Sequence, residues 1–233
     1  MLVYSAYEQG RPNAVELLKD YLDVYPASRH ADEVNFLIGS AHFGQGEYQK
    51  AIFWFNESNI DMLSPEQQEA YCFRLAYSLL QIGDMEKARG YFARIEQIGT
   101  KYREASTYYV AYIDYATGKY NNALVEFTRL KDLPDYKERS LYYITQIYFI
   151  QNKYEKVISE GKELLASYPD SENNSEVYRI MGNAYYHLGN EDQAINMLSK
   201  YVSSTDSPLR GDLYILGVCY YNKGCLLYTS PSP

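Results

Sequence analysis

Cysteine and histidine are both scarce in this sequence, with three of each among 233 residues. The cysteines are Cys72, Cys219 and Cys225, and the histidines are His30, His42 and His187. The odd number of cysteines and the lack of a Cys-x-x-Cys pair argue against a disulfide framework and against a zinc site. No two histidines have the spacing of metal ligands. We therefore expect no metal and no other cofactor, and we expect His42 to be a packed or hydrogen-bonded side chain.

Long apolar runs and an excess of positive charge are also missing. No apolar run approaches the roughly 20 residues that span a bilayer, and the mean hydropathy is −0.44, so we expect no membrane span. The formal net charge of −8 argues against nucleic acid as the main partner. Residues 1–8 lack the basic region and the apolar core of a signal peptide. The protein is thus either cytoplasmic or begins inside a longer gene product, which leaves its localisation open.

Motifs of catalysis are absent as well. The segment Gly44-Gln45-Gly46 follows no strand pattern and precedes no Lys-Ser/Thr pair, so it is not a phosphate-binding loop. No Gly-x-Ser-x-Gly motif occurs, and no Cys and His pair has a catalytic context. The acidic pairs at 32–33 and 191–192 fall where helices are expected to begin, and carboxylates there interact favourably with the helix dipole. The sequence predicts no catalytic residues and a protein that is not an enzyme.

Tyrosine is the residue in surplus, with 28 residues against 8 Phe and 1 Trp. A tyrosine ring offers a large contact area with a polar tip, which suits half-buried interfaces. A surplus of this size indicates that part of these rings line an interface.

A pattern of small and bulky residues recurs every 34 to 37 residues. Its small apolar anchors are Ala14, Ala51, Ala88, Ala123, Val157 and Ala194. The residues four positions later are Leu18, Phe55, Phe92, Phe127, the exception Gly161, and Leu198. Residues four apart share one helix face, so each anchor predicts a helix that buries one side.

A turn and a second helix precede each anchor. The turn residues, five positions earlier, are Gly46, Gly83, Gly118, Asn152 and Gly189. Small residues twelve positions earlier are Gly39, Ala76, Ala111, Thr145 and Gly182. Prolines that we interpret as closing the units are Pro26, Pro65, Pro134, Pro169 and Pro208. Each period thus predicts two helices joined by a tight turn, with a small residue where the second helix approaches the first.

The best-formed unit combines Tyr178, Met181-Gly182, Tyr185, Gly189, Ala194, Leu198 and Pro208. This pattern resembles the tetratricopeptide repeat, a helix-turn-helix unit of 34 residues. The resemblance covers nearly the whole chain in six copies of near-equal spacing. It implies an all-α fold, an α-solenoid of stacked hairpins that forms a right-handed superhelix. It also implies a non-enzymatic scaffold that binds a protein or a peptide.

We expect the repeat array to span residues 1–224. Its units are a partial repeat 1–29, the repeats 30–63, 64–100, 101–134, 135–171 and 172–208, and a partial repeat 209–224. The pattern is lost at 225–233, a tail that resembles translated sequencing-adapter read-through; a genuine short Pro/Ser tail is the alternative. Because repeat arrays need polar terminal caps and none is visible, we interpret the chain as a fragment of a longer repeat protein.

The resemblance also indicates where a partner binds. In such arrays positions 2, 5, 9 and 12 of each first helix face a concave groove. The groove residues implied here are Phe36, Phe73, Tyr77, Tyr108, Tyr112, Tyr115, Tyr142, Phe149, Arg179, Asn183 and Tyr186. We expect Tyr77, Tyr108, Tyr112 and Tyr142 to lie close together and form the main binding surface. The alternative is that these rings pack between repeats, as expected for the core positions Tyr148 and Tyr185.

The class of partner stays open at this stage. Arrays that hold acidic C-termini of chaperones carry Lys and Asn at positions 5 and 9, where the central repeats here have aromatic residues, so that role is not expected. A local patch suited to an anion could involve only Arg139, Gln146, Arg179 and Asn183. A glycan-binding module of the cell envelope, whose groove rings stack on sugars, is the alternative function.

Two segments bear on the source of the chain. Residues 25–28 and 168–171 both read Tyr-Pro-x-Ser and look like repeat endings of bacterial cell-envelope tetratricopeptide repeat proteins, including Tol–Pal-associated and outer-membrane assembly factors. The Tyr-rich style also resembles large repeat proteins of Bacteroidetes. The resemblance implies a bacterial protein of the cell envelope or periplasm.

Overall fold

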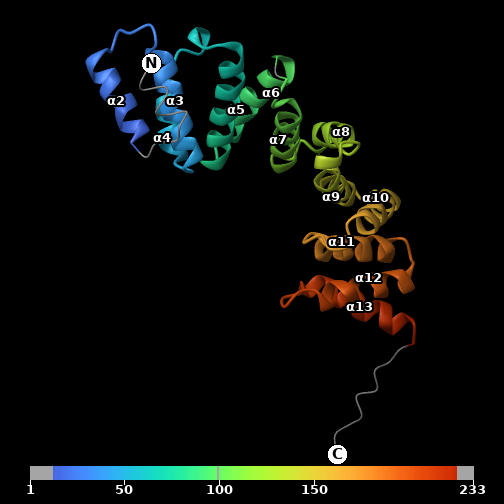
Figure 1. Cartoon of the computed structure of the whole chain (residues 1–233). Coiled ribbons are helices and arrows are strands. Elements are labelled where there is room, and N and C mark those ends of the chain that lie inside the picture. Colours follow the sequence, from blue (N-terminus) through green and yellow to red (C-terminus); the bar gives the residue numbers. More distant parts are fainter. Residues whose placement is uncertain (1–12, 99, 225–233) are drawn as a thin grey trace, which may run out of the picture. The chain divides into compact units, whose positions relative to one another are not determined.

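The computed structural model describes residues 13–98 and 100–224 (Figure 1). Within these residues there are 12 α-helices, a single 3-10 helix and no strand, so the predicted all-α fold is confirmed. Residues 1–12 of the expected partial repeat 1–29 and the tail at 225–233 lie outside the described residues.

The helices come in pairs along the chain. Their bounds are α2 (Ala14–Val24), α3 (Ala31–Gly44), α4 (Tyr48–Asn56), α5 (Pro65–Gln81), α6 (Met85–Ile98), α7 (Arg103–Ala116), α8 (Tyr120–Leu130), α9 (Pro134–Ile150), α10 (Tyr154–Ser167), α11 (Asn174–His187), α12 (Glu191–Ser203) and α13 (Arg210–Asn222), with the 3-10 helix η1 (Ile60–Met62) after α4. The five pairs from α3/α4 to α11/α12 are each joined by a three-residue turn.

The turns follow the expected chemistry. The residues with positive φ are Gly46, Gly83, Gly118, Gly189 and Gly224, together with Asn152. Five of these are the predicted turn residues, and only Gly and Asn adopt this left-handed conformation readily. At the first turn the N–H of Gly46 donates to the carbonyl of Phe43 at 3.0 Å, which closes α3 before α4 begins. The local sequence therefore sets where each first helix ends.

Two prolines have a different role from the one expected. Pro65 and Pro134 are the first residues of α5 and α9 and so open the next unit instead of closing the previous one. A proline at the first helical position loses nothing, because its missing N–H would have no partner within the helix. Ser64 supports the start of α5 by a capping box, in which its side chain accepts from the N–H of Gln67.

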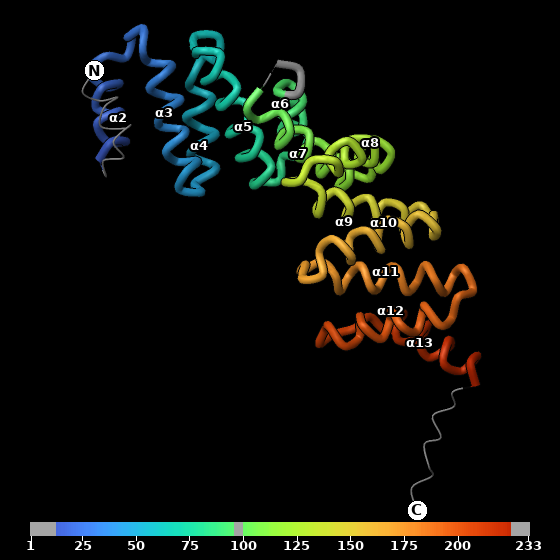
Figure 2. The backbone as a smooth tube through the Cα atoms, turned by 45° about the vertical axis from the view of Figure 1, so that its right-hand side comes forward, coloured from blue at the N-terminus to red at the C-terminus, as the bar shows by residue number. Residues whose placement is uncertain are grey.

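The chain divides into two compact units, which we describe separately. Unit 1 ends at Ile113 and unit 2 begins at Asp114, so the boundary falls inside α7. In unit 1, α3 packs on both α4 and α5, and α5 packs on α6. In unit 2, α11 packs on α10, α12 and α13, and Figure 2 shows α11, α12 and α13 lying side by side.

The core of unit 1 depends on close approach of paired helices. A Cβ added to Gly39 on α3 would lie 2.7 Å from the ring of Phe55 on α4, so only glycine fits there. Phe55 and Phe92 are fully buried, as are their anchors Ala51 and Ala88. The predicted small and bulky positions thus form the contacts between the two helices of a pair.

Unit 2 shows how the exceptional Gly161 is accommodated. A Cβ on Gly161 would lie 2.5 Å from the sulfur of Met181, which therefore occupies the space that a bulky side chain takes in the other repeats. The next pair returns to the usual arrangement, because a Cβ on Gly182 would lie 2.6 Å from Leu198. Val157 and Ala194, the anchors of these repeats, are fully buried.

Candidate functional site

The predicted groove residues of unit 1 differ in exposure. Phe73, Tyr77, Tyr108 and Tyr112 are half-buried. Phe36 is only 4% exposed and packs 6.2 Å from the ring of Phe55, which makes it a core residue. Burial of Phe36 leaves four of the five aromatic positions of unit 1 with ring surface at which a partner could bind.

Phe73, Tyr77 and Tyr108 belong to a connected cluster of aromatic side chains on α5 and α7 that also includes Tyr102, just before α7. Phe73 stacks on Tyr102 at 4.5 Å between centroids, and its neighbour Tyr77 makes an edge contact with Tyr109 at 5.5 Å. Tyr109 makes a further edge contact with Tyr108 at 5.4 Å. Contacts of this geometry are favourable, so each ring of the cluster is supported by its neighbours.

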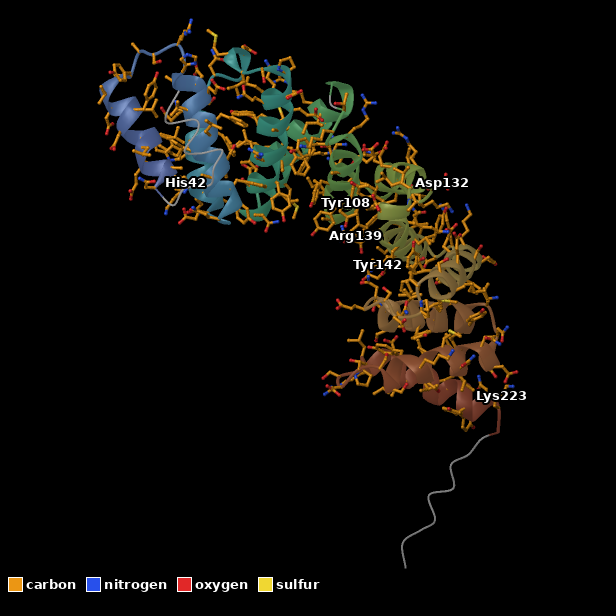
Figure 3. The ribbon with its side chains drawn as sticks, viewed as in Figure 1. His42, Tyr108, Asp132, Arg139, Tyr142 and Lys223 are labelled. Atoms are coloured by element: carbon orange, nitrogen blue, oxygen red, sulfur yellow. The ribbon has the colours of Figure 1, made fainter. Side chains whose placement is uncertain are left out.

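A cavity of about 330 Å³ opens on this cluster. We call it the tyrosine cavity, and it is lined by Tyr77, Leu80, Gln81, Met85, Tyr108, Tyr109 and Tyr112. Three of the predicted groove tyrosines therefore line one cavity of unit 1, with Tyr108 visible on α7 in Figure 3. The fourth, Tyr142, lies in unit 2, and its grouping with the other three stays a prediction.

A second cavity of unit 1, of about 510 Å³, lies beside the first turns of α5. We call it the arginine cavity, and it is lined by Phe36, Leu37, Glu66, Gln67, Glu69, Ala70, Arg74, Thr100, Lys101 and Tyr102. Glu69 is buried there, and one carboxylate oxygen accepts from the backbone N–H groups of Thr100 and Tyr102 at 2.9 and 2.7 Å. This carboxylate fixes the loop that leads into α7 and so shapes the cavity wall.

In unit 2, the predicted residues Tyr115 and Tyr142 are tied to Gln146 of α9. The hydroxyl of Tyr115 donates to the side-chain oxygen of Gln146. Burial raises the pKa of Tyr142, with a smaller contribution from the charge of Glu176. Figure 3 shows Tyr142 and Arg139 on the same helix. The hydroxyl groups of this surface are thus held in defined positions.

Two of the four residues of the expected anion patch, Arg179 and Asn183, are engaged by other side chains of unit 2. Arg179 donates to both carboxylate oxygens of Glu176, at 2.7 and 2.6 Å, and lies 3.7 Å from Asp212 on α13. Its pKa is raised, first by the hydrogen bonds to Glu176. Asn183 is buried, 6% exposed, and donates to Asp212 at 2.7 Å. The cluster links α11 to α13 and leaves neither Arg179 nor Asn183 for an external anion.

The other predicted groove residues of unit 2 support this cluster or border it. The guanidinium of Arg179 lies over the ring of Phe149, 5.8 Å from its centroid. Tyr186 is half-buried and contacts His187, which stacks on Tyr154 at 4.6 Å. The aromatic rings of unit 2 at these positions therefore also make contacts within the fold.

Two of the side chains expected to be structural have that role. His42 is buried, and its Nδ1 lies 2.6 Å from a carboxylate oxygen of Glu47, so it is hydrogen-bonded as predicted. The hydrogen bonds from Lys50 and His42 lower the pKa of Glu47. Tyr185 is buried, as expected of a core position.

Several residues that line the two cavities were not predicted from the sequence, in particular Arg74, Met85 and Tyr109. The predicted groove positions follow a single stripe along each first helix. Arg74 lies one turn before Tyr77 on α5, and Tyr109 follows Tyr108 on α7. A helix turns by 3.6 residues, so a broader stripe of the same helix face could have included Arg74.

Metal-binding groups and membrane-spanning helices do not occur among the described residues. No group of three or more His, Cys, Asp or Glu side chains there could hold a metal ion. No helix at 13–98 or 100–224 combines the length and the apolar character needed to cross a membrane. Cys72 and Cys219 are free and buried, and burial raises the pKa of both thiols.

Comparison with known families agrees with the repeat pattern. Two sequence profiles, both described as tetratricopeptide repeat, match the chain: one at residues 1–60 and the other at 69–97 and 176–204. The chain belongs to the tetratricopeptide repeat family. No curated protein matches its sequence.

Solved structures of tetratricopeptide repeat proteins share the fold at low sequence identity. A tetratricopeptide repeat protein from Parabacteroides merdae is 16% identical, with a TM-score of 0.60 over 95% of this chain and 84% of that one. YrrB, described as a TPR protein with an unusual peptide-binding site, is 11% identical, with a TM-score of 0.64 over 88% and 97%. MamA is 16% identical, with a TM-score of 0.62 over 77% and 98%. At these identities the likeness establishes the fold alone.

Proposed function

We propose that this tetratricopeptide repeat protein is a non-enzymatic scaffold that binds a protein or a peptide through the aromatic rings of its first helices. The observation that carries the proposal is the tyrosine cavity, to which α5 and α7 of consecutive repeats both contribute. The family supports it, and so does YrrB, a structural neighbour whose description includes a peptide-binding site.

The chemistry of the cavity favours a peptide over a glycan. A sugar site needs flat exposed rings flanked by carboxylates or amides that bind hydroxyl groups. The tyrosine cavity contains one amide, that of Gln81, and its remaining walls include the apolar side chains of Leu80 and Met85. Such a lining suits an apolar or aromatic side chain of a peptide, and the flexible Met85 adapts to its shape.

The mutual contacts of the rings give the proposal its energetic basis. Tyrosine side chains give a large contact area and lose little conformational entropy on binding, because few of their bonds rotate. Phe73, Tyr77 and Tyr109 already contact one another, so these rings need little further ordering when a peptide binds. A few such anchors commonly dominate a binding energy.

The test is selection from a phage-displayed library of random dodecapeptides against the purified chain. Peptides selected by the natural chain should bind a Tyr108→Ala, Tyr112→Ala double variant at least about tenfold more weakly, since truncation of a binding hot spot costs about 2 kcal/mol or more. Far-UV circular dichroism should show that the double variant stays helical.

A matched control removes two exposed rings of unit 1 outside the cavity, by Tyr25→Ala and Phe53→Ala, whose side chains are 58% and 56% exposed. This control should bind the selected peptides as the natural chain does. Unfolding of the Tyr108→Ala, Tyr112→Ala variant would show that these rings are core between repeats. Unchanged peptide binding by a folded double variant would place the binding surface elsewhere.

A further inference from the structure

Arg74 in the arginine cavity has no counter-ion in the part of the chain that the structure describes. One Nη1 N–H donates to the hydroxyl of Ser40 at 2.5 Å, and the guanidinium lies over the ring of Phe36, 5.6 Å from its centroid. The side chain is half-buried. Arg74 is thus a half-buried cation that has a hydroxyl acceptor and an aromatic neighbour but no ion pair among the described residues.

The neighbouring charges of the cavity do not supply that counter-ion. Glu69 accepts the N–H groups of Thr100 and Tyr102, which engage its carboxylate. Lys101 adds a second positive charge to the lining, with its Nζ 5.4 Å from the ring centroid of Tyr102. Lys101 also forms no ion pair among the described residues. Glu66 also lines the cavity, so the lining carries two cations and two carboxylates, but Glu66 forms no ion pair with Arg74 or Lys101 among the described residues.

We infer that the arginine cavity binds one carboxylate of the peptide partner, the side chain of an Asp or a Glu. Nε and Nη2 of Arg74 are the edge that donates to both carboxylate oxygens, because Nη1 is engaged by Ser40. Lys101 contributes its charge. This inference rests on the proposed function, because it assigns a second contact to the same peptide.

The position of Arg74 predicts the spacing of the motif. Arg74 and Gln81, which lines the tyrosine cavity, are seven residues apart on α5, or about 10 Å along the helix axis at 1.5 Å per residue. An extended peptide covers that distance in about three residues. The carboxylate should therefore lie about two to four positions from the apolar residue that enters the tyrosine cavity.

The net charge of the chain limits how acidic the ligand is. With a formal net charge of −8, the protein repels a strongly acidic peptide at long range. A single carboxylate bound locally by Arg74 and Lys101 is compatible with that field. We therefore expect one acidic residue in the motif and not an acidic run.

The peptide selection described above tests the inference. Peptides selected by the natural chain should be enriched in Asp or Glu at the stated distance from an aromatic or apolar residue, and peptides selected by Arg74→Gln should lose that enrichment. A synthetic peptide of the best clone should bind Arg74→Gln at least about tenfold more weakly than it binds the natural chain, since hydrogen-bonded charge pairs are among the stronger polar contacts. Arg74→Lys, which keeps the charge but not the fork, should restore only part of the binding.

The control is Arg129→Gln, which makes the same change of net charge at an exposed arginine paired with Glu126 on α8. It should leave peptide binding unchanged. A measurement on the natural chain covers the case that Arg74→Gln does not fold. In this measurement the natural chain should bind the selected peptide about tenfold more weakly when its Asp or Glu is replaced by Asn or Gln.

Equal binding of the acid and amide peptides would overturn the inference and leave the proposed function standing. An equal loss of peptide binding in Arg129→Gln would show that the overall charge causes the effect, and it would also overturn the inference. Failure to select any peptide would overturn both proposals together.

Discussion

Tyr71 on α5 shows how a tyrosine of this chain serves the core and not a surface. Its ring is buried against Phe55, and its hydroxyl donates to the backbone carbonyl of Phe55 at 2.9 Å. Burial raises the pKa of Tyr71 to about 12 from its ordinary value of 10.0. The neutral hydroxyl is therefore the form that the fold stabilises.

A raised pKa makes stability depend on pH in one direction. Below pH 10 Tyr71 is neutral in the folded and unfolded states, and its contribution is fully present. Between pH 10 and about 12 the unfolded chain releases this proton while the folded chain keeps it, so the free energy of unfolding falls. Tyr71→Phe should weaken that fall. It should also lower stability near neutral pH by about 1 kcal/mol, because the carbonyl of Phe55 loses its donor.

The measurement is the midpoint of urea unfolding at neutral and alkaline pH, followed by the fluorescence of Trp54, the single tryptophan. Tyr214→Phe, at a ring that is 72% exposed, should behave as the natural chain. The same alkaline loss in Tyr71→Phe as in the natural chain would show that other groups cause it.

At the scale of helices and turns, much of the fold could be predicted because its determinants are local. Gly46 and Asn152 fix turns by adopting positive φ, and the period of anchors fixes which helix face is buried. The role of Pro65 could not be read from spacing. The same spacing from the anchors fits a proline that ends one unit and a proline that begins the next, and only the helix geometry assigns Pro65 to the start of α5.

The candidate site was less predictable than the helices. The resemblance to tetratricopeptide repeats implied that Tyr77, Tyr108 and Tyr112 share one surface, and these three residues do line one cavity. It did not predict the burial of Phe36 or the pairing of Arg179. The burial of Phe36 depends on Phe55, and the pairing of Arg179 depends in part on Asp212. These partners lie on other helices, so the periodicity along one helix does not predict the contacts.

Close packing of paired helices gives a prediction at this scale. Gly39→Ala should lower the free energy of unfolding by about 1 to 3 kcal/mol, because the added methyl lies 2.7 Å from a ring carbon of the fully buried Phe55. Gly90→Ala on α6 is the matched control, since its Cβ meets nothing within 4 Å. It should raise stability by about 0.5 to 1 kcal/mol through helix propensity alone. The free energy of unfolding of both variants is measured by urea unfolding. An unchanged value for Gly39→Ala would mean that Phe55 moves aside freely.

At the scale of the whole molecule, the division into two compact units matters for how the chain unfolds. Unit 1 has its own cores around Leu75 and Ile38, and unit 2 has a core around Leu164. In a repeat array each unit is stabilised by its own contacts and by those to its nearest neighbours. A loss of packing at one end should therefore reach the other end only through the repeats between them.

Leu164→Ala and Leu75→Ala form the pair of variants that tests this expectation. Both side chains are buried in helical cores, so each truncation should cost about 2 to 5 kcal/mol locally. Trp54 on α4 reports on unit 1, whereas far-UV circular dichroism reports on all helices. Leu75→Ala should lower the urea midpoint of Trp54 fluorescence. Leu164→Ala should make the circular dichroism signal begin to fall at a lower urea concentration. It should change the urea midpoint of Trp54 fluorescence much less, because α4 lies several helices away along the chain. Equal shifts of both probes in both variants would show one cooperative unit and would contradict the nearest-neighbour account.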